Sequence, residues 1–290
     1  MRSKLADLMF NYLVYDVFTD RPFCGNQLAV FPDARDIPED KLQFIAAEFN
    51  FSEVTFIYPP HDTSNTARLR IFTPTHEVDF AGHPIIGTVI ALSDLGREDD
   101  MTLELGIGNI ACKVENGWSS FTAHQTLERL SKPDPHLVAK ALRVSKDAIV
   151  TKPHVPIIAS LGLPFVLVEL SDLSRLSACL PEIEFFREGA QAHPESHDFA
   201  IFAYVREGDN IRSRMFAPLD NIPEDPATGS ATATLSALLT ELLDEPQSLC
   251  FLQGVEMGRP SIIQSETTLS PMSVTISGQA VKVMQGVFSI

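Results

Sequence analysis

One seven-residue motif occurs twice in this chain, and the distance between its copies restricts the folds that the chain can adopt. The segment RLRIFTP begins at Arg68 and the segment RSRMFAP begins at Arg212. Both fit the pattern R-x-R-x-F-x-P, and they begin 144 residues apart, close to half of the 290-residue length. The spacing suggests a duplicated fold with a site between the halves. Four matching letters can recur by chance, so the motif alone proves little, and the segments that follow each copy are the stronger evidence.

The segments after the two copies repeat the same order of features. The first copy leads through acidic residues to a turn around Gly82, and the second leads through acidic residues to a turn around Gly229. Each turn enters an apolar, helix-like stretch, at residues 89–95 and 233–243. A helix that starts after a glycine turn presents backbone N–H groups and a partial positive charge. We therefore expect each half to offer an anion-binding helix start.

Composition excludes several classes of protein. Apolar residues make up 44% of the chain, enough for a large core in one domain or in two of about 140 residues. The net charge of −16 argues against a nucleic-acid or anionic-membrane partner, which needs a basic face. The chain has no apolar window of about 18 residues, and residues 1–11 lack a secretory signal. We expect a cytoplasmic protein that does not span a membrane.

Alternating apolar and polar residues predict more strands than helices. Two further helices are expected, at residues 41–49 and 135–142, and the segment 127–135, with two prolines, is the best linker candidate. We predict a first half of residues 1–128 and a second half of residues 129–279. The final segment, residues 280–290, should return to the first half as a strand.

A metal site has only superficial support. His76, Glu77, Asp79 and His83 lie within eight residues. Gly82 and Pro84 interrupt any helical face, so His76 and His83 cannot bind one ion from neighbouring helical turns. We expect no metal.

Cofactor and nucleophile motifs are missing as well. The segment Gly106-Ile-Gly108 lacks the third glycine of a dinucleotide loop and predicts a hairpin turn. Ser230 lies in T-G-S-A rather than in G-x-S-x-G, which favours a role as a donor at a helix start. The four cysteines form no C-x-x-C pair, so we expect reduced thiols. We expect no organic cofactor.

Five segments, in order along the chain, form a longer pattern. They are GNQLAV at 25–30, SEVTF at 52–56, TPTHEVDFAGHP at 73–84, EDPATGSA at 224–231 and QGVEMGRPS at 253–261. Together they resemble the signature segments of the PhzF family, the phenazine-biosynthesis isomerase-like proteins. The sequence departs from that family at Gln27, at Ile85-Ile86 and at Leu252. These departures bear on the identity of the substrate and not on the fold.

The resemblance implies an α+β, diaminopimelate-epimerase-like fold. Such a fold has two pseudo-symmetric halves, each a curled, mostly antiparallel, barrel-like sheet around a central helix, with the active site in the cleft between them. It also implies a homodimer and an isomerase without metal or organic cofactor. The family is typified by the enzyme that isomerises trans-2,3-dihydro-3-hydroxyanthranilate.

The resemblance also implies the site residues. Glu53 matches the glutamate that moves a proton between ring carbons. The other matching positions are His83, Asp225 and Ser230 as side chains, Gly82 and Gly229 as backbone donors, and Ser52 and Asn26 as substrate-binding residues. Each of the three ionisable residues has an alternative role: Glu53 as a surface glutamate, His83 as a structural histidine and Asp225 as a helix cap.

The expected substrate is a small carboxylic acid, because two helix N-termini would hold its carboxylate and stabilise charge on the carbon that loses its proton. The expected base is a carboxylate, since shielding from water raises the pKa of such a group toward the range that reversible proton transfer needs. Two alternatives stay open. One is a racemase or epimerase that uses Glu53 with another acid in place of the usual two cysteines; Cys24 resembles such a cysteine only superficially. The other is a non-catalytic small-acid binding protein.

Overall fold

The computed structural model describes residues 8–290, and these residues form two compact units. The first unit comprises the described residues up to Phe23, together with Gln27–Phe121 and Gln279–Ile290. The second unit comprises Cys24–Asn26 and Thr122–Gly278. The chain therefore enters the second unit briefly at residues 24–26, long before its main crossing at residue 122.

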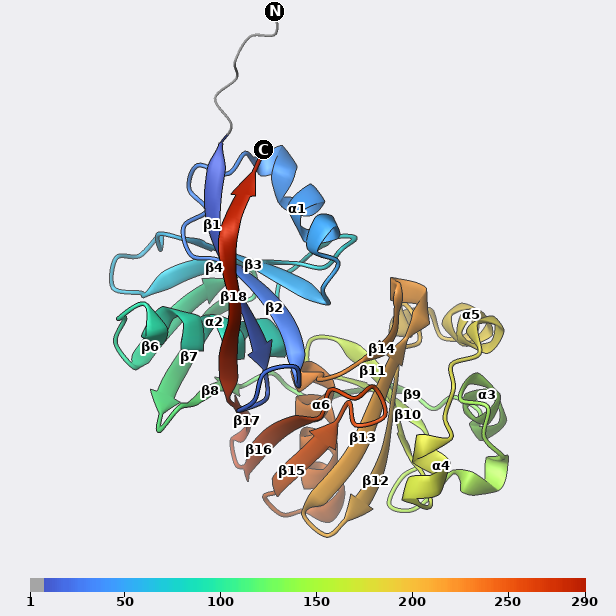
Figure 1. Cartoon of the computed structure of the whole chain (residues 1–290). Helices are drawn as coiled ribbons and strands as arrows, with labels where there is room; N and C mark the ends of the chain where they lie inside the picture. The colour runs from blue at the N-terminus through green and yellow to red at the C-terminus, as the bar shows by residue number, and fades with distance from the viewer. Residues whose placement is uncertain (1–7) are drawn as a thin grey trace, which may run out of the picture. The chain divides into compact units, whose positions relative to one another are not determined.

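The first unit is built on a mostly antiparallel sheet (Figure 1). Its strands are β1 (Met9–Val17), β2 (Asn26–Phe31), β3 (Glu53–Tyr58), β4 (Ala67–Phe72), β5 (Glu77–Val78), β6 (Asp100–Leu105), β7 (Gly108–Glu115), β8 (Trp118–Ala123) and β18 (Ala280–Ser289). Strand β18 pairs antiparallel with β1. Strand β2 pairs parallel with β3, and β3 pairs antiparallel with β4. Strand β4 then takes β5 antiparallel at one end and β6 parallel at the other, and β7 and β8 follow antiparallel.

The second unit repeats this order of pairings. Its strands are β9 (Glu128–Ser131), β10 (Ile157–Ser160), β11 (Pro164–Glu169), β12 (Ile201–Glu207), β13 (Asn210–Ala217), β14 (Ile222–Asp225), β15 (Ser248–Gln253), β16 (Ser261–Leu269) and β17 (Met272–Gly278). Strand β10 pairs antiparallel with β9 and β11. Strand β11 pairs parallel with β12, and β12 pairs antiparallel with β13. Strand β13 takes β14 antiparallel and β15 parallel, and β16 and β17 follow antiparallel.

The two copies of the repeated motif occupy the same place in the two sheets. Arg68 and Arg70 lie on β4, while Arg212 and Arg214 lie on β13. In each unit this strand has three partner strands. Its short antiparallel partner, β5 or β14, carries acidic residues. Its parallel partner, β6 or β15, follows a long helix in the chain. The internal duplication predicted from the spacing is confirmed by these matching pairings.

Helices connect the strands at matching points. They are α1 (Leu42–Phe49), α2 (Gly82–Asp94), α3 (Pro135–Ala141), α4 (Leu173–Ser177), α5 (Ile183–Ala192) and α6 (Gly229–Leu243), with short 3-10 turns η1 (Glu39–Lys41), η2 (Lys146–Ala148), η3 (Pro194–Ser196) and η4 (Pro218–Asp220). Helix α1 forms the crossover between the parallel strands β2 and β3, and α4 and α5 lie in the crossover between β11 and β12.

One long buried helix packs against each sheet. Helix α2 contacts β1, β3, β7 and β18, and α6 contacts β10, β11, β16 and β17. A β-carbon at Gly87 would lie 2.6 Å from side-chain atoms of both Val17 and Leu28, so only glycine lets α2 come this close to the sheet. These arrangements confirm the expected α+β fold, with a curled sheet around a central helix in each half.

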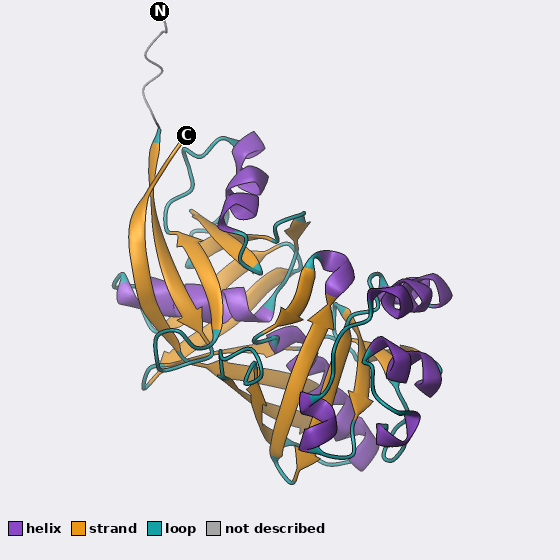
Figure 2. Cartoon of the chain, turned by 45° about the vertical axis from the view of Figure 1, so that its right-hand side comes forward, coloured by secondary structure: helices purple, strands orange, loops and turns teal. Residues whose placement is uncertain are grey.

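One local prediction needs correction. The segment 127–135, predicted as a linker, contains β9, which pairs antiparallel with β10. Residues 127 and 132–134 lack regular structure, and Pro135 already begins α3. Helices α4 and α5 were not among the expected helices, and α5 buries only Phe186 and Gly189. These helices lie beside the sheet of the second unit (Figure 2), where Leu176 and Phe186 join its core. The predicted domain limits of 128 and 279 stay a prediction.

A hydrogen-bonded group of polar side chains lies in the second unit. The ring of His154 forms hydrogen bonds with the Tyr204 hydroxyl (Nε2 to oxygen, 2.7 Å) and with the carbonyl of Val155 (Nδ1 to oxygen, 2.8 Å). The Tyr204 hydroxyl also lies 3.4 Å from Glu169 Oε2. Burial lowers the pKa of His154. The hydrogen bond to the Val155 carbonyl raises this pKa in part, and the charge of Arg129 lowers it. Burial raises the pKa values of Tyr204 and Glu169.

This environment predicts a pH-dependent stability. Below about pH 6.5, the usual pKa of histidine, the unfolded chain takes up a proton at His154 while the folded protein does not. The free energy of unfolding should therefore fall as the pH is lowered from about 7.5 to 5.5. Urea unfolding of the wild type and of His154→Gln measures this. The variant should lose part of the pH dependence, whereas replacement of the exposed His124 by glutamine should not; equal slopes in all three proteins would contradict the assignment.

Candidate active site

In the first unit, Glu53 and His83 lie in contact. Helix α1 ends at Phe49 and is closed by Asn50 in the left-handed conformation, with φ of 51°. The chain then turns into β3, whose first residue, Glu53, pairs with Leu28 of β2. This puts the side chain of Glu53 at the end of a strand, where its Oε2 atom lies 3.1 Å from Nδ1 of His83.

His83 is held by the start of α2. The helix begins at Gly82, after Ala81 in an extended conformation, so His83 is its second residue. The side chain of His83 is 4% exposed and that of Glu53 is 17% exposed. A carboxylate that is mostly shielded from water, beside an imidazole at a helix N-terminus, is a pair that can take up and return a proton. Backbone amides at the start of a helix suit the binding of an anion.

In the second unit, a hydrogen-bonded group surrounds Asp225, the last residue of β14. The Asn26 side-chain amide donates to Oδ1 of Asp225 at 2.9 Å and to the carbonyl of Ala227 at 3.1 Å. The Thr228 hydroxyl donates to Oδ2 at 2.5 Å. Asn26 and Asp225 are both buried. The carboxylate is therefore fixed in orientation by two donors from segments that are far apart in the sequence.

Gln253 completes this group, and the sequence alone assigned it no role. It is fully buried at the end of β15. Its amide nitrogen donates to the Asp225 carbonyl at 2.8 Å and to the Thr228 hydroxyl at 3.0 Å, while its oxygen accepts from the Thr228 amide at 3.2 Å. Gln253 lies in one of the five matched segments, and that position was the only sequence signal for it. A side chain that uses both ends of its amide in this way fixes the loop before α6.

The other predicted residues lie at the same local positions. Ser52 precedes β3 and is half-buried. Gly82 and Gly229 are the first residues of α2 and α6, and Ser230 is the second residue of α6. The structure thus brings Glu53 and His83 together in the first unit, and Asn26 and Asp225 together in the second. The roles of all these residues stay predictions.

The structure describes the contacts of the histidine-rich segment and the state of the cysteines. Nδ1 of His76 lies 2.9 Å from the Thr75 hydroxyl. Within residues 8–290, no three or more His, Cys, Asp or Glu side chains lie together so that they could hold a metal ion. All four cysteines are free thiols. Burial raises the pKa of the Cys112 and Cys179 thiols to about 12, so both are poor nucleophiles near neutral pH.

The sequence matches a known family over most of its length. Residues 15–286 match the PhzC-PhzF family, described as phenazine biosynthesis-like protein. The chain belongs to this family. An uncharacterized isomerase of Mesorhizobium japonicum is 36% identical over 294 residues, which cover 95% of this chain and 97% of that protein. The trans-2,3-dihydro-3-hydroxyanthranilate isomerase of Pseudomonas fluorescens is 37% identical over 265 residues, covering 88% of this chain and 89% of that enzyme. This PhzF-like chain is an isomerase.

Solved structures agree on the fold. A PhzF-family phenazine biosynthesis protein of Bacillus anthracis has a TM-score of 0.85 at 23% identity, covering 98% of this chain and 100% of that chain. A hydroxyproline epimerase from Agrobacterium vitis has a TM-score of 0.63 at 15% identity, covering 97% of this chain and 91% of that chain. The PhzF fold is thus related to that of amino-acid epimerases. No helix within residues 8–290 has both the length and the apolar character needed to cross a bilayer.

Proposed function

We propose that this PhzF-like isomerase moves a proton between two carbon atoms of a small carboxylic acid, with Glu53 as the general acid and base. The observation that carries the proposal is the 3.1 Å contact between Glu53 Oε2 and His83 Nδ1, in a pair that is largely shielded from water. Positioned carboxylates of this kind act in proton transfer to and from carbon.

The proposed reaction conserves atoms and charge. The carboxylate of Glu53 takes a proton from carbon, and the electron pair of the broken C–H bond enters the adjacent double-bond system. The carboxylic acid of Glu53 then returns the proton to a different carbon, so the double bond moves and the carboxylate is restored. His83 holds the carboxyl group in place during both steps, and amides at the start of α2 stabilise the negative charge that develops.

We assign substrate binding to the second group of residues. The Asp225 oxygens accept hydrogen bonds from Asn26 and Thr228, and a carboxylate oxygen can accept more than one bond, so a substrate amine or hydroxyl can donate to the same group. The amides of Gly229 and Ser230, at the start of α6, suit a substrate carboxylate. That these residues act on the same substrate as Glu53 is inferred from the sequence repeat and the family resemblance.

The substrate is proposed by chemical class. The relative from Pseudomonas fluorescens is named for trans-2,3-dihydro-3-hydroxyanthranilate, a cyclic amino acid with ring double bonds. This compound is the first to test. The family departures at Gln27 and Leu252 lie beside Asn26 and Gln253, so a related carboxylic acid with a different ring substituent fits the proposal equally well. The homodimer and the cytoplasmic location stay predictions.

Incubation in heavy water with a chelator present tests the function. Candidate carboxylic acids are followed by NMR and mass spectrometry. The expected result is relocation of a double bond, with deuterium at the new C–H position to the extent that Glu53 exchanges with solvent. Inversion of a stereocentre without relocation would replace the proposal with an epimerase. Binding without either change would identify a non-catalytic binding protein, and activity that returns only when a metal ion is added would overturn the metal-free mechanism.

A further inference from the structure

The loop between β15 and β16 packs directly on the backbone that carries Asp225. Gly254 has a φ of 72°, and a β-carbon there would lie 2.5 Å from the Arg259 carbonyl oxygen and 2.7 Å from that of Pro226. The hydroxyl of Ser261 donates to the same Pro226 carbonyl at 2.8 Å. The loop therefore has one tightly defined position, and its side chains are placed with it.

Arg259 extends from this loop to the Cys24–Asn26 segment. Its Nε donates to the Gly25 carbonyl at 2.8 Å, and its NH2 nitrogen donates to the Cys24 carbonyl at 2.9 Å. The Gly25 amide in turn donates to the carbonyl of Pro260 at 3.2 Å. These hydrogen bonds attach two consecutive peptide units to the loop, and residues 24–26 belong to the second compact unit although residues 23 and 27 do not.

The next residue after this attachment is Asn26, whose amide donates to Asp225 Oδ1 and to the Ala227 carbonyl. We propose that Arg259 is a positioning residue: by holding the carbonyls of Cys24 and Gly25, it places the Asn26 amide on Asp225. The inference rests on the proposed function only in giving Asp225 a role in substrate binding. The contact with Asn26 is then the route by which Arg259 affects the reaction.

The chemistry of arginine suits this task. A guanidinium is planar and presents parallel N–H donors, so it can bind two adjacent carbonyl oxygens at once and fix the direction of the chain. A lysine at position 259 would offer one compact ammonium group on a flexible stem and would not fix both carbonyls. Arg259→Lys should therefore give an intermediate defect, and Arg259→Met a full one.

A double-mutant cycle with Asn26→Ala tests the route of action. Hydrogen bonds from a charged group contribute enough that Arg259→Met should lower kcat/KM by about 10-fold to 100-fold. If Arg259 acts through Asn26, the same change made in Asn26→Ala should lower kcat/KM by less than about 2-fold more. A reduction of the same size in both backgrounds would show that Arg259 acts independently, and an unchanged kcat/KM in Arg259→Met would overturn the proposal.

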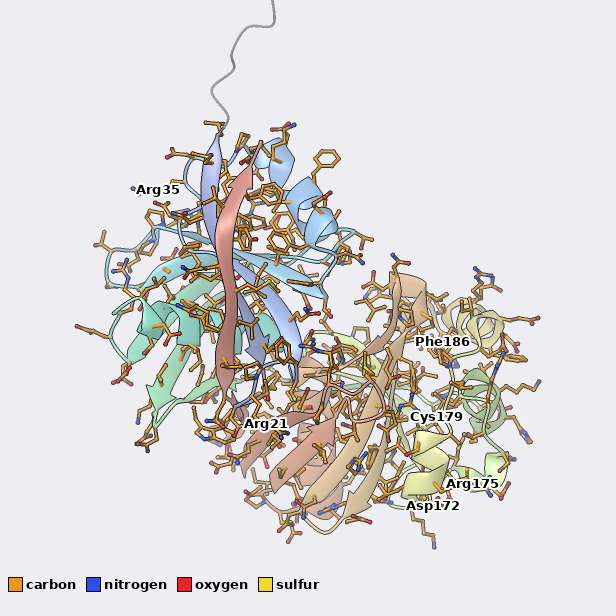
Figure 3. The ribbon with its side chains drawn as sticks, in the orientation of Figure 1. Arg21, Arg35, Asp172, Arg175, Cys179 and Phe186 are labelled. Carbon is orange, nitrogen blue, oxygen red and sulfur yellow. The ribbon has the colours of Figure 1, made fainter. Side chains whose placement is uncertain are left out.

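Two controls accompany the double-mutant cycle. Arg175→Met removes an exposed arginine of α4 in the same unit (Figure 3), and it should leave kcat/KM unchanged. The Asn26 side-chain amide, observed by NMR, reports on positioning without any turnover: its protons should exchange with solvent faster in Arg259→Met and in Arg259→Lys than in the wild type. A changed Asn26 signal in a protein without isomerase activity would reject the function but keep the positioning role, whereas an unchanged signal would reject the positioning role itself.

Discussion

Replacing Glu53 with glutamine should lower kcat by about 100-fold or more while leaving the protein folded. Glutamine has nearly the same shape as glutamate but cannot accept a proton from carbon. Its amide can still contact Nδ1 of His83, so the 3.1 Å contact of the native pair has a neutral substitute. Binding of a carboxylate ligand should change little, because the helix starts that bind it are unaltered. Steady-state kinetics, isothermal titration calorimetry and thermal unfolding measure these three properties.

Glu48→Gln is the matched control for this variant. Glu48 is an exposed glutamate of α1 in the same unit, and its replacement should leave kcat unchanged. If Glu53→Gln keeps more than about a tenth of the wild-type kcat, Glu53 is not the essential base. If it loses ligand binding together with turnover, Glu53 binds the substrate rather than transferring its proton.

The duplicated architecture was predictable because its signals are local. The motif letters alternate along a strand, and the glycine turns precede apolar helices, so each half carries its own pattern of strand, turn and helix. The start of α2 at Gly82 and of α6 at Gly229 follows from the same signal. A pattern that repeats at half the chain length then implies matching sheets, and the pairings of β4 and β13 bear this out.

The remaining features depend on contacts between distant segments. The role of Gln253 follows from its two-ended contact with Asp225 and Thr228, about 25 residues away, which no periodicity encodes. Arg259 binds carbonyl groups 234 and 235 residues earlier in the chain. The acceptors of these hydrogen bonds are backbone carbonyl groups, which every residue has. The residue types at positions 24 and 25 therefore do not reveal the contact. The role of Asn26 was implied by the resemblance, but its partner was not.

The repeated motif also shows how one local arrangement acquires different surroundings. Arg70 and Arg214 each bind a glutamate of the next short strand, Glu77 and Glu224 respectively, through two hydrogen bonds. Each guanidinium also lies over the phenylalanine two residues later, at 5.1 Å for Arg70 and 4.8 Å for Arg214. The local contacts are therefore duplicated together with the sheet.

Burial separates the two arginines. The side chain of Arg214 is 5% exposed, and its NH1 nitrogen also donates to the carbonyls of Leu176, Ser177 and Cys179 at the end of α4. The NH1 nitrogen of Arg70 donates instead to the carboxylate of Glu39, whose side chain is 75% exposed. Solvent therefore screens the ion pairs of Arg70 more than the ion pair of Arg214.

Arg214→Met should consequently destabilise the protein by about 3 to 5 kcal/mol, because it leaves the carboxylate of Glu224 and three carbonyl groups without their buried cationic partner. Arg70→Met, the matched change in the other motif copy, should cost about 1 kcal/mol or less, since its ion pairs face solvent. Denaturant unfolding of both variants measures the difference, and Arg214→Lys, which keeps the charge but not the planar fork, should fall between the wild type and Arg214→Met. If Arg214→Met does not fold, the comparison of Arg214→Lys with Arg70→Lys still ranks the two sites. Equal losses at both positions would mean that the three carbonyl bonds and the burial of Arg214 add nothing to stability.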